Sequence, residues 1–490
     1  MNAPVIHTVK INLPGGIIAS GDLHDILNAV ENAGVECIGF GNRQQLFFQV
    51  AGDQLEQLEH DFSVADIDYE LNADQYPNII SSYVVEDIFE NANWLREGVY
   101  KDILDLFDFK PRLKINLTDN NQTFIPFFTG NLNFIASETS NYWHLYVRFP
   151  KTNTTFNWPS LIYSEDIPQI SKMMEECIFS NKDLFYDQAN INTKLFEEKM
   201  TSRRRFTIQL PAQPLKLPDF QLPYYEGFNR YGTKYWLGIY RRDELFPVNF
   251  LKDLCTLCHN TRIGQLYTTP WKSVIIKSIE KEHRKLWSYI LDSYRINVRH
   301  AANEMNWQIE DMSDYGLKLK YYLVQEFEKE DLRTYRLCFA IKTQPKTGLF
   351  GSIVIKPQQK EDAEEHFEIL HTKDFNPNSK VYITYKREIQ KANLGTELVD
   401  LCNSFYKLQC ELSVDPSLSA EMKPEKIEEE IQYAYQCRNC FTIYDKEYGD
   451  EWQNIPPGTG FEQISEYRCP LCDAAKEEFI LIDRMNNQLR

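Results

Sequence analysis

Four cysteines near the end of the chain have the spacing of a metal-binding cage. They form two Cys-x-x-Cys pairs, Cys437 with Cys440 and Cys469 with Cys472. A Cys-x-x-Cys turn directs both sulfurs toward one point, and two such turns can surround a cation tetrahedrally. Four thiolates suit either a single iron or a zinc ion, so the spacing alone leaves the metal open.

The residues around the two pairs distinguish between the metals. They are Tyr435, Ile443-Tyr444-Asp445, Gly449-Asp450, Pro456-Pro457-Gly458-Thr459-Gly460-Phe461-Glu462, Cys469-Pro470-Leu471-Cys472 and Lys476. This stretch resembles a rubredoxin nearly from end to end, whereas a zinc ribbon would share only the cysteines. The resemblance implies one iron, cycling between ferrous and ferric, with Cys437, Cys440, Cys469 and Cys472 as ligands.

A four-thiolate site of this kind suits the transfer of single electrons. Both oxidation states keep nearly the same geometry, and backbone N–H groups in the two turns can donate to the sulfurs and set the potential. The segment offers no nucleophile, general acid or open coordination position, so we expect it to carry electrons. We expect a small aromatic core of Tyr435, Tyr444, Phe461 and Phe479.

The segment departs from the family at two positions. Rubredoxins usually have Gly directly after the second Cys of each pair, where the backbone takes positive φ, but this chain has Phe441 and Asp473. Asp tolerates the left-handed region fairly well and Phe poorly. We therefore expect Phe441 to be strained or to sit in an altered turn.

Composition limits the function classes that the whole chain can serve. With 490 residues, it is long enough for several domains. The formal charge of −18 argues against nucleic acid and anionic membranes as partners, and suits a basic patch on a redox protein. Eleven cysteines without a disulfide framework, no signal peptide and no membrane-length apolar run predict a cytoplasmic protein.

Hydrophobic periodicity predicts a β-α-β-β-α unit that occurs twice. The first copy has strands at 5–12, 37–40 and 45–50 and helices at 22–34 and 52–61. The second has strands at 205–210, 234–240, 263–267 and 273–277 and helices at 248–259 and 279–293. Two copies of one motif indicate an internal duplication.

Two further α+β blocks lie between and after the copies. The first is expected to have helices at 86–107 and 166–178 and strands at 112–117, 131–136 and 144–149. The second is expected to have strands at 317–326, 334–342 and 350–356 and helices at 361–371 and 394–409. Residues 411–432 are acidic and contain Pro, which is typical of a tether.

The body, over residues 5–405, resembles the sirohaem-dependent sulfite and nitrite reductases. The matching stretches are Gly41-Asn42-Arg43-Gln44, Asn78-Ile79-Ile80-Ser81-Ser82, Pro111-Arg112-Leu113-Lys114 and Thr268-Thr269-Pro270-Trp271. In that family, basic residues in the matching turn and strand bind the sirohaem carboxylates and the substrate. The resemblance therefore implies that Arg43, Arg112 and Lys114 could bind a tetrapyrrole or another anion, although an isolated Arg is more often a structural ion pair.

One departure from that family decides the chemistry. Its members carry a Cys-x5-Cys and a Cys-x3-Cys pair for a 4Fe–4S cluster, and neither spacing occurs in this chain. We therefore expect no 4Fe–4S cluster and no sulfite or nitrite reduction by the body. The remaining close pair, Cys255 and Cys258, falls on an apolar helix and is expected to be buried and free.

The expected fold class is α+β, with duplicated ferredoxin-like half domains, two sirohaem-reductase-like α+β domains and a small rubredoxin-type iron-binding domain. The expected domains are residues 1–75 and 201–295 for the half domains, 76–200 and 296–410 for the reductase-like domains, 411–432 for an acidic linker and 433–490 for the rubredoxin domain.

The favoured function is electron transfer, with the reductase-like body as a docking platform for a redox partner such as a nitrite or sulfite reductase. Two alternatives stay open. The body could bind sirohaem or another cofactor and act as an oxidoreductase fed by the iron. Otherwise the four cysteines could hold zinc in a scaffold protein.

Overall fold

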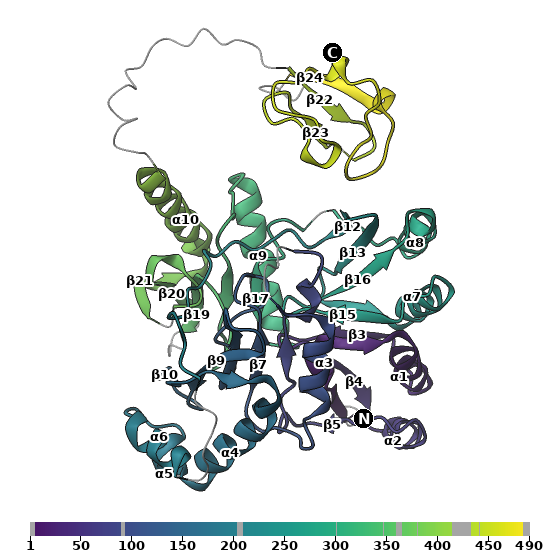
Figure 1. Ribbon diagram of the computed structural model, residues 1–490. Coiled ribbons are helices and arrows are strands. Elements are labelled where there is room, and N and C mark those ends of the chain that lie inside the picture. The colour runs from purple at the N-terminus through teal and green to yellow at the C-terminus, as the bar shows by residue number, and fades with distance from the viewer. Residues whose placement is uncertain are drawn as a thin grey trace. The chain divides into compact units, whose positions relative to one another are not determined.

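The computed structural model describes residues 5–89, 94–202, 209–299, 301–345, 347–358, 365–379, 381–413, 433–440 and 442–483. The chain divides into two compact units, residues 1–227 with 236–405 and residues 228–235 with 406–490. We call the part of the first unit up to residue 405 the body, and residues 433–483 the C-terminal module (Figure 1). None of the helices in these ranges combines the length and the apolar run needed to cross a membrane.

The two copies of the repeated unit are both present in the chain. The first copy consists of β1 (Ile6–Ile11), β2 (Ile17–Ala19), α1 (Ser20–Asn32), β3 (Cys37–Phe40), β4 (Leu46–Ala51), α2 (Leu55–Val64) and β5 (Glu70–Leu71). The second consists of β12 (Gly227–Tyr231), β13 (Lys234–Tyr240), β14 (Leu245–Pro247), α7 (Val248–Asn260), β15 (Gln265–Thr268), β16 (Ser273–Ile279) and α8 (Arg284–Ser293). The strand that was expected at 205–210 lies largely outside the described residues.

Each copy gives one short strand to the sheet of the other. The first sheet has the order β14-β3-β4-β1-β5, and the second contains β13-β16-β15-β2 in that order. Thus β14 pairs antiparallel with β3, from Leu245 opposite Gly39 to Pro247 opposite Cys37. In the same way, β2 pairs antiparallel with β15. The helices that follow the exchanged strands, α1 and α7, pack against each other (Figure 1).

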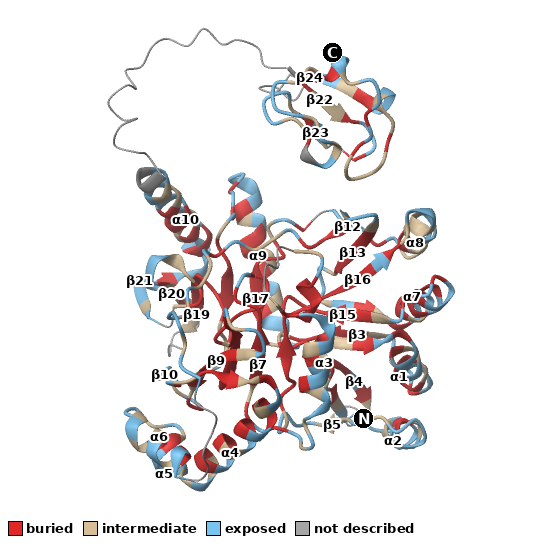
Figure 2. Ribbon diagram, viewed as in Figure 1, coloured by how far each residue is buried: buried red, intermediate tan, exposed pale blue. Residues whose placement is uncertain are grey.

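Two further sheets follow one pairing scheme. One has the order β6-β7-β8-β9-β10, with β11 also paired to β9, and the other has the order β17-β18-β19-β20-β21. In both sheets the first three strands are parallel to one another and the fourth pairs antiparallel with the third. Figure 2 shows that the central strands of these sheets are buried, as is usual for parallel strands.

The bounds of the elements around these sheets are as follows. The first block has β6 (Ile80–Ser81), α3 (Glu97–Asp105), β7 (Ile115–Thr118), β8 (Leu132–Ala136), β9 (Tyr142–Arg148), β10 (Thr155–Asn157), β11 (Ile162–Tyr163), α4 (Ile167–Ser180), α5 (Lys182–Phe185) and α6 (Thr193–Thr201). The second block has β17 (Trp307–Ile309), α9 (Asp314–Lys329), β18 (Phe339–Ile341), β19 (Ile353–Gln358), β20 (His366–Thr372), β21 (Tyr382–Gln390) and α10 (Lys391–Ser413).

Three of the expected elements were wrong. The helix expected at 86–107 begins only at Glu97, after a 3-10 turn at Tyr83–Val85. The strand expected at 317–326 is part of α9, because its buried residues recur every three or four positions, as Leu319, Leu323 and Phe327 do. The helix expected at 361–371 is wrong where the chain is described, because Phe367 and Ile369 alternate with less buried neighbours in β20.

The C-terminal module is a small three-stranded sheet with long connecting loops. Its strands are β22 (Tyr433–Cys437), β23 (Ile443–Tyr444) and β24 (Phe479–Asp483), in the order β23-β22-β24. Both pairings are antiparallel. Most of the expected acidic tether, residues 414–432, lies outside the described residues.

Candidate metal centre

Two hydrogen-bonded turns bring the four cysteines of the C-terminal module together. The first turn follows β22 and is closed by the Cys437 amide, which donates to the Thr442 carbonyl at 2.8 Å. The second is closed by the Cys469 amide, which donates to the Ala474 carbonyl at 2.9 Å. The two turns therefore have the same closing bond, from the first cysteine of the pair to the residue five positions later.

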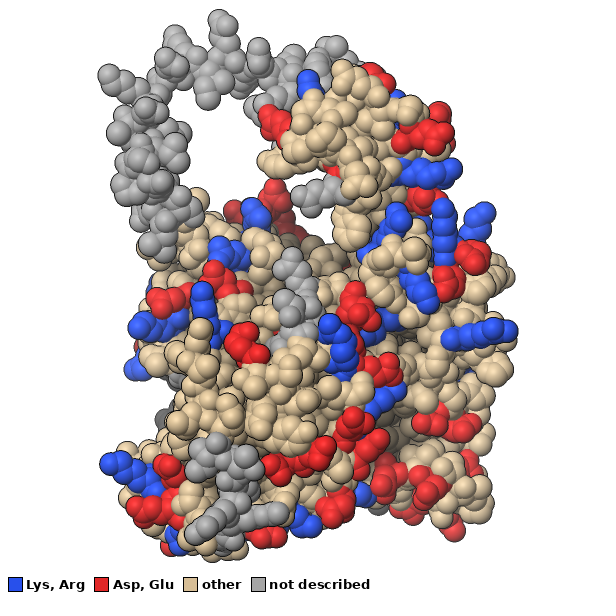
Figure 3. All heavy atoms as spheres, in the orientation of Figure 1, with Lys and Arg blue, Asp and Glu red and all other residues tan. Residues whose placement is uncertain are grey.

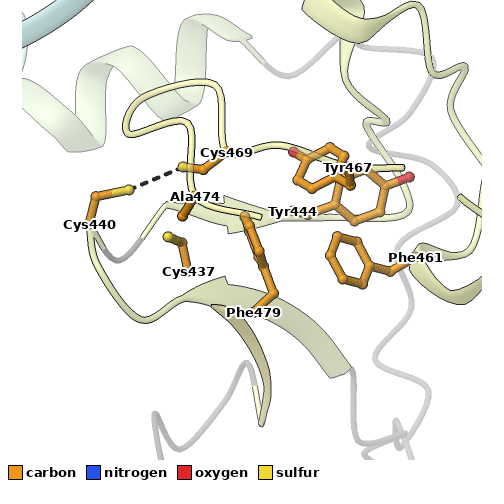
Figure 4. Packing of buried hydrophobic residues seen from close by; sticks show 8 residues of the cluster. All are labelled: Cys437, Cys440, Tyr444, Phe461, Tyr467, Cys469, Ala474 and Phe479. Carbon is orange, nitrogen blue, oxygen red and sulfur yellow. Dashed lines mark hydrogen bonds between the residues drawn. The ribbon is translucent and has the colours of Figure 1, made fainter. Parts of the chain in front are cut away.

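The four sulfur atoms converge on one point. All four Sγ atoms lie within 4.8 Å of one another. The Sγ atoms of Cys440 and Cys469 are 3.2 Å apart (Figure 4). Those of Cys437 and Cys472 are 3.4 Å apart. A tetrahedral ion with bonds of about 2.3 Å to sulfur needs sulfurs about 3.8 Å apart. The donor set and its spacing thus fit a single four-coordinate iron or zinc ion.

Backbone amides point at the sulfurs and would stabilise them as thiolates. The amides of Leu471 and Cys472 hydrogen-bond the Cys469 sulfur, and the amide of Ala474 hydrogen-bonds that of Cys472. On the other turn, the Cys440 sulfur is bonded by Thr442 through its amide and through its hydroxyl, whose Oγ1 lies 2.9 Å away. Such donors favour the more negative charge state of a ligand set and so affect a bound metal's potential.

One thiol of the cluster is already acidic. A hydrogen bond with the Cys469 sulfur, helped by the donors of Thr442, lowers the pKa of Cys440 to about 4. The same shared proton raises the pKa of Cys469. The contact between the two sulfurs therefore favours the thiolate of Cys440, which is the form that binds a cation.

An aromatic cluster supports the turns. Tyr444, Phe461, Tyr467 and Phe479 are buried together with three of the cysteines (Figure 4). Tyr435 packs against this cluster. The four aromatic residues expected from the sequence are confirmed in this cluster. Tyr467 was missed, although it lies two residues before Cys469 and contacts three of the rings.

Tyr467 also anchors the loop between the turns. Its hydroxyl donates to the Asp450 carboxylate at 2.8 Å in a buried position. The same carboxylate accepts from the amide of Trp452 at 2.9 Å. Burial, followed by the bond to Asp450, raises the pKa of Tyr467, so the phenol keeps its proton and remains a donor.

The two positions where Gly was expected have different outcomes. Asp473 has φ of 58°, in the left-handed region, as the comparison with rubredoxins predicts. Its amide donates to the Cys469 carbonyl at 2.8 Å, which completes the turn. Phe441, for which strain was predicted, lies outside the described residues.

Arg43 in the body is a buried structural residue. Its Nη2 donates to the carbonyls of Asn78 and Ile115 at 2.7 and 2.9 Å, and its Nη1 lies 3.3 Å from Asn116 Oδ1. Burial lowers the pKa of Arg43 to about 9. Most of its donors are thus engaged by carbonyl and side-chain oxygens of the protein.

Arg112 is engaged by Glu175, whereas Lys114 lies close enough to Arg43 to be repelled by its charge. Arg112 pairs with Glu175 at 2.9 Å and lies over the ring of Phe179 at 4.3 Å. Lys114 is partly buried, which together with repulsion from Arg43 lowers its pKa to about 8. None of these three residues is among the described residues that line the cleft of Arg148, Lys342 and Lys356.

The second close cysteine pair is buried in α7. Cys255 and Cys258 lie among Leu251, Leu254 and Leu257, and burial raises the pKa of Cys255 to about 12. A thiol with so high a pKa is a poor metal ligand or nucleophile at neutral pH. Both cysteines are free.

Comparisons with known proteins agree with the division into body and module. A family model described as Rubredoxin matches residues 434–479. The chain is 48% identical to the probable rubredoxin-2 of Methanocaldococcus jannaschii over 50 residues. The matched residues make up 10% of this chain and 89% of that protein. The chain is also 41% identical over 49 residues to the rubredoxin of Azotobacter vinelandii. These residues make up 10% of this chain and 68% of that protein.

The body is similar in fold to a solved structure. The NirA protein of Mycobacterium tuberculosis matches with a TM-score of 0.64 at 13% identity, over 84% of each chain. At this identity the likeness shows the fold alone. Together with the module match, it confirms the expected α+β class with a reductase-like body and a rubredoxin-type domain.

Proposed function

Because the chain belongs, through residues 434–479, to the rubredoxin family, we propose that it is an electron-transfer protein. A single iron held by the four cysteines would supply one redox-active centre that accepts and gives up one electron at a time. The reductase-like body would serve as the docking platform for a redox partner.

The observation that carries this proposal is the convergence of the four sulfurs. Cys437, Cys440 and Cys469 are buried, with at most 8% of each exposed, whereas Cys472 is partly exposed. A metal held there would be shielded from water on three sides, and the Cys472 side would be the shortest way for an electron to enter or leave. The amide donors on the sulfurs would tune its potential.

The residues of the module bind and protect the metal rather than perform acid–base chemistry. Tyr467 and Asp450 fix the loop between the turns, and the aromatic cluster keeps water from one side of the sulfurs. All four cysteines act as ligands, which leaves no position for a substrate on a four-coordinate ion. This arrangement favours outer-sphere transfer of electrons to a second protein.

The body supplies the surface that we propose for docking. The sequence has no Cys-x5-Cys or Cys-x3-Cys pair, which supports a body without a 4Fe–4S cluster of its own. We propose docking domains at 1–75, 76–200, 201–295 and 296–410, a linker at 411–432, and a cytoplasmic redox protein as partner. A nitrite or sulfite reductase is the first partner to test.

A spectrum and a metal analysis of the purified full chain test the proposal. We expect one iron per chain, a red ferric form that bleaches with dithionite, and uptake of one electron per chain. Stoichiometric zinc and no visible absorption, after growth with iron available, would contradict the proposal and favour the scaffold. Additional tetrapyrrole bands would instead favour the cofactor-binding oxidoreductase.

A further inference from the structure

A pocket of the body lies at the edge of a sheet where β17 and β18 begin. It has a volume of about 310 Å³, and its walls come from the segments 221–225, 302–306 and 333–337. The last two segments lead into β17 and β18, which begin at the same edge because they are parallel. The proposed electron transfer does not use this pocket. We call it the Tyr–Arg pocket, after four residues in its lining, Tyr224, Tyr335, Arg333 and Arg336.

Hydrogen bonds tie the walls of the pocket together. The Asn306 amide nitrogen donates to the Leu337 carbonyl at 3.0 Å, which joins the second segment to the third. The Tyr225 hydroxyl donates to the Met305 carbonyl at 2.6 Å, which joins the first segment to the second. A pocket that is held in this way needs little reorganisation to accept a ligand, and this favours binding.

Asn306 brings an unused hydrogen-bond acceptor to the pocket. This residue lines the pocket and is 5% exposed. Its Oδ1 is buried and has no hydrogen-bond partner among the described residues, whereas its Nδ2 is engaged by Leu337. A buried acceptor without a partner is costly, so an N–H or O–H group of a ligand that reaches Oδ1 would be stabilising.

Two tyrosine rings in the lining are partly open to solvent. Tyr224 is 47% exposed and Tyr335 is 40% exposed. The Tyr224 hydroxyl donates to the Glu226 carboxylate at 2.8 Å, which holds this side chain in place. Exposed rings beside a pocket offer flat apolar surface on which a flat ligand can stack.

The charge of the lining is positive. Arg333 and Arg336 line the pocket, and no Asp or Glu is among the described residues that do so. The Arg333 guanidinium lies over the Tyr335 ring, 4.6 Å from its centre. The Arg336 guanidinium is 4.0 Å from the carboxylate of Asp219, whose side chain is almost fully exposed, so this ion pair is weak.

This positive lining contrasts with the rest of the protein. The chain carries a net charge of −18, and acidic side chains gather over α2 and α3 on the face drawn in Figure 3. A pocket lined by cations in so acidic a protein would attract a small anion by its local field.

We propose that the Tyr–Arg pocket binds a flat aromatic or heteroaromatic molecule that carries one phosphate or carboxylate group. The ring would lie against Tyr224 and Tyr335, and the anionic group would lie against Arg333 and Arg336. An N–H group of the ring system would donate to Asn306 Oδ1. The volume of about 310 Å³ is at the lower end for small-molecule sites, which favours a ligand with one ring system over a dinucleotide. The proposal does not depend on the metal in the C-terminal module.

Calorimetric titration of the full chain with AMP and with indole-3-acetate tests this. Each probe has a flat ring system, an N–H donor and one anionic group. At least one of them should bind, one molecule per chain, with a dissociation constant below about 1 mM. The uncharged adenosine and indole should bind at least about tenfold more weakly, because they lack the contact with the arginines.

The two probes also distinguish the anionic groups. Binding of AMP alone assigns a phosphate ligand, binding of indole-3-acetate alone assigns a carboxylate ligand, and binding of both supports the shared chemistry. Absence of binding by both probes would overturn the proposal. Equal affinity for the charged and the uncharged molecules would overturn it too.

Two variants and a matched control locate the binding. Arg333→Gln removes one charge and Tyr335→Leu removes one ring, and each should weaken binding at least about tenfold. Both residues are exposed, so we expect these variants to fold as the parent does. Arg262→Gln changes an exposed arginine just after α7, outside the pocket, and should leave binding unchanged. Unchanged binding by Arg333→Gln, or an equal loss in Arg262→Gln, would contradict the assignment to this pocket.

Discussion

Arg43 and Asn78 bind each other's backbone. The Arg43 guanidinium donates to the Asn78 carbonyl through Nε at 3.0 Å and Nη2 at 2.7 Å, and the Asn78 side chain donates to the Arg43 carbonyl at 2.8 Å. This reciprocal contact ties the turn after β3 to the segment before β6. It explains how an arginine predicted to bind an anion can be retained for the fold itself.

Replacing Arg43 should therefore destabilise the body. Arg43→Met leaves the carbonyls of Asn78 and Ile115 without these donors, so the free energy of unfolding should fall by about 2–4 kcal/mol. Urea unfolding followed by tryptophan fluorescence measures this. Arg112→Met is the matched control, with an expected loss of about 1 kcal/mol, because Arg112 is partly exposed. Equal losses in both variants would contradict the structural role of Arg43.

Removing a sulfur of the metal centre should remove the metal, and the further Cys-x-x-Cys pair in α7 provides the control. Cys440→Ser should abolish stoichiometric iron and the visible absorption, because serine is a poor ligand for the ion. Cys255→Ala changes the pair in α7 and should leave the iron content and the visible absorption unchanged. Metal analysis of the two purified variants decides the matter, and a loss of iron from Cys255→Ala would refute the assignment.

The positive φ of Asp473 predicts opposite effects of two substitutions. Asp473→Gly should stabilise the module by up to about 1 kcal/mol, because Gly adopts φ of 58° without strain. Asp473→Val should cost about 1–2 kcal/mol, because a β-branched residue is strained there. The rate at which a chelator removes the metal measures the effect of each substitution on the stability of the module. Equal rates for the two variants would show that the backbone at this position relaxes.

The hydroxyl of Tyr467 should matter for stability and little for the potential. Tyr467→Phe removes the buried bond to Asp450 and should destabilise the module by about 1–2 kcal/mol. The ring contacts with Phe461 and Phe479 remain, so the iron environment is kept. Thermal unfolding and a redox titration of the same sample separate the two quantities. A large shift of the potential without loss of stability would count against this role.

Because the pKa of Lys114 is lowered, replacing this lysine should raise the free energy of unfolding, and the gain should depend on pH. Between about pH 8 and 10.5 the folded chain releases a proton that the unfolded chain keeps, so the charged Lys114 costs stability below pH 8. Lys114→Met should raise the free energy of unfolding by at most about 3 kcal/mol at pH 7. The gain should shrink as the pH rises toward 10. A gain that is equal at both pH values would be inconsistent with a charged Lys114.

The metal centre could be predicted from the sequence because the residues that form it lie close together in the chain. The two Cys-x-x-Cys pairs, the aromatic residues and Asp473 lie within about fifty residues and act through turns whose geometry their own sequence sets. A cleft in the body that is lined by Arg148, Lys342 and Lys356 could not be predicted in this way. Arg148, Lys342 and Lys356 come from three strands of two sheets, and nothing in their spacing relates them until the sheets meet.

The errors in secondary structure have a similar cause. The tyrosine-rich segment 317–326 has strand-like composition, but burial of Leu319, Leu323 and Phe327 on one face made it part of α9. The charged residues around 361–371 favour a helix locally, whereas pairing with β19 and β21 makes His366–Thr372 a central strand. In both places tertiary partners that are distant in sequence outweighed local preference.

The exchange of β2 and β14 between the sheets of the two copies has a consequence for the origin of the chain and for cutting it into fragments. A polypeptide that contained only one copy would present an open β-edge and a helix without its neighbour, and could complete itself only by pairing with an identical molecule. The duplication would thus have fused a symmetric dimer into one polypeptide. Fragments cut between the copies should recover their structure only when both are mixed.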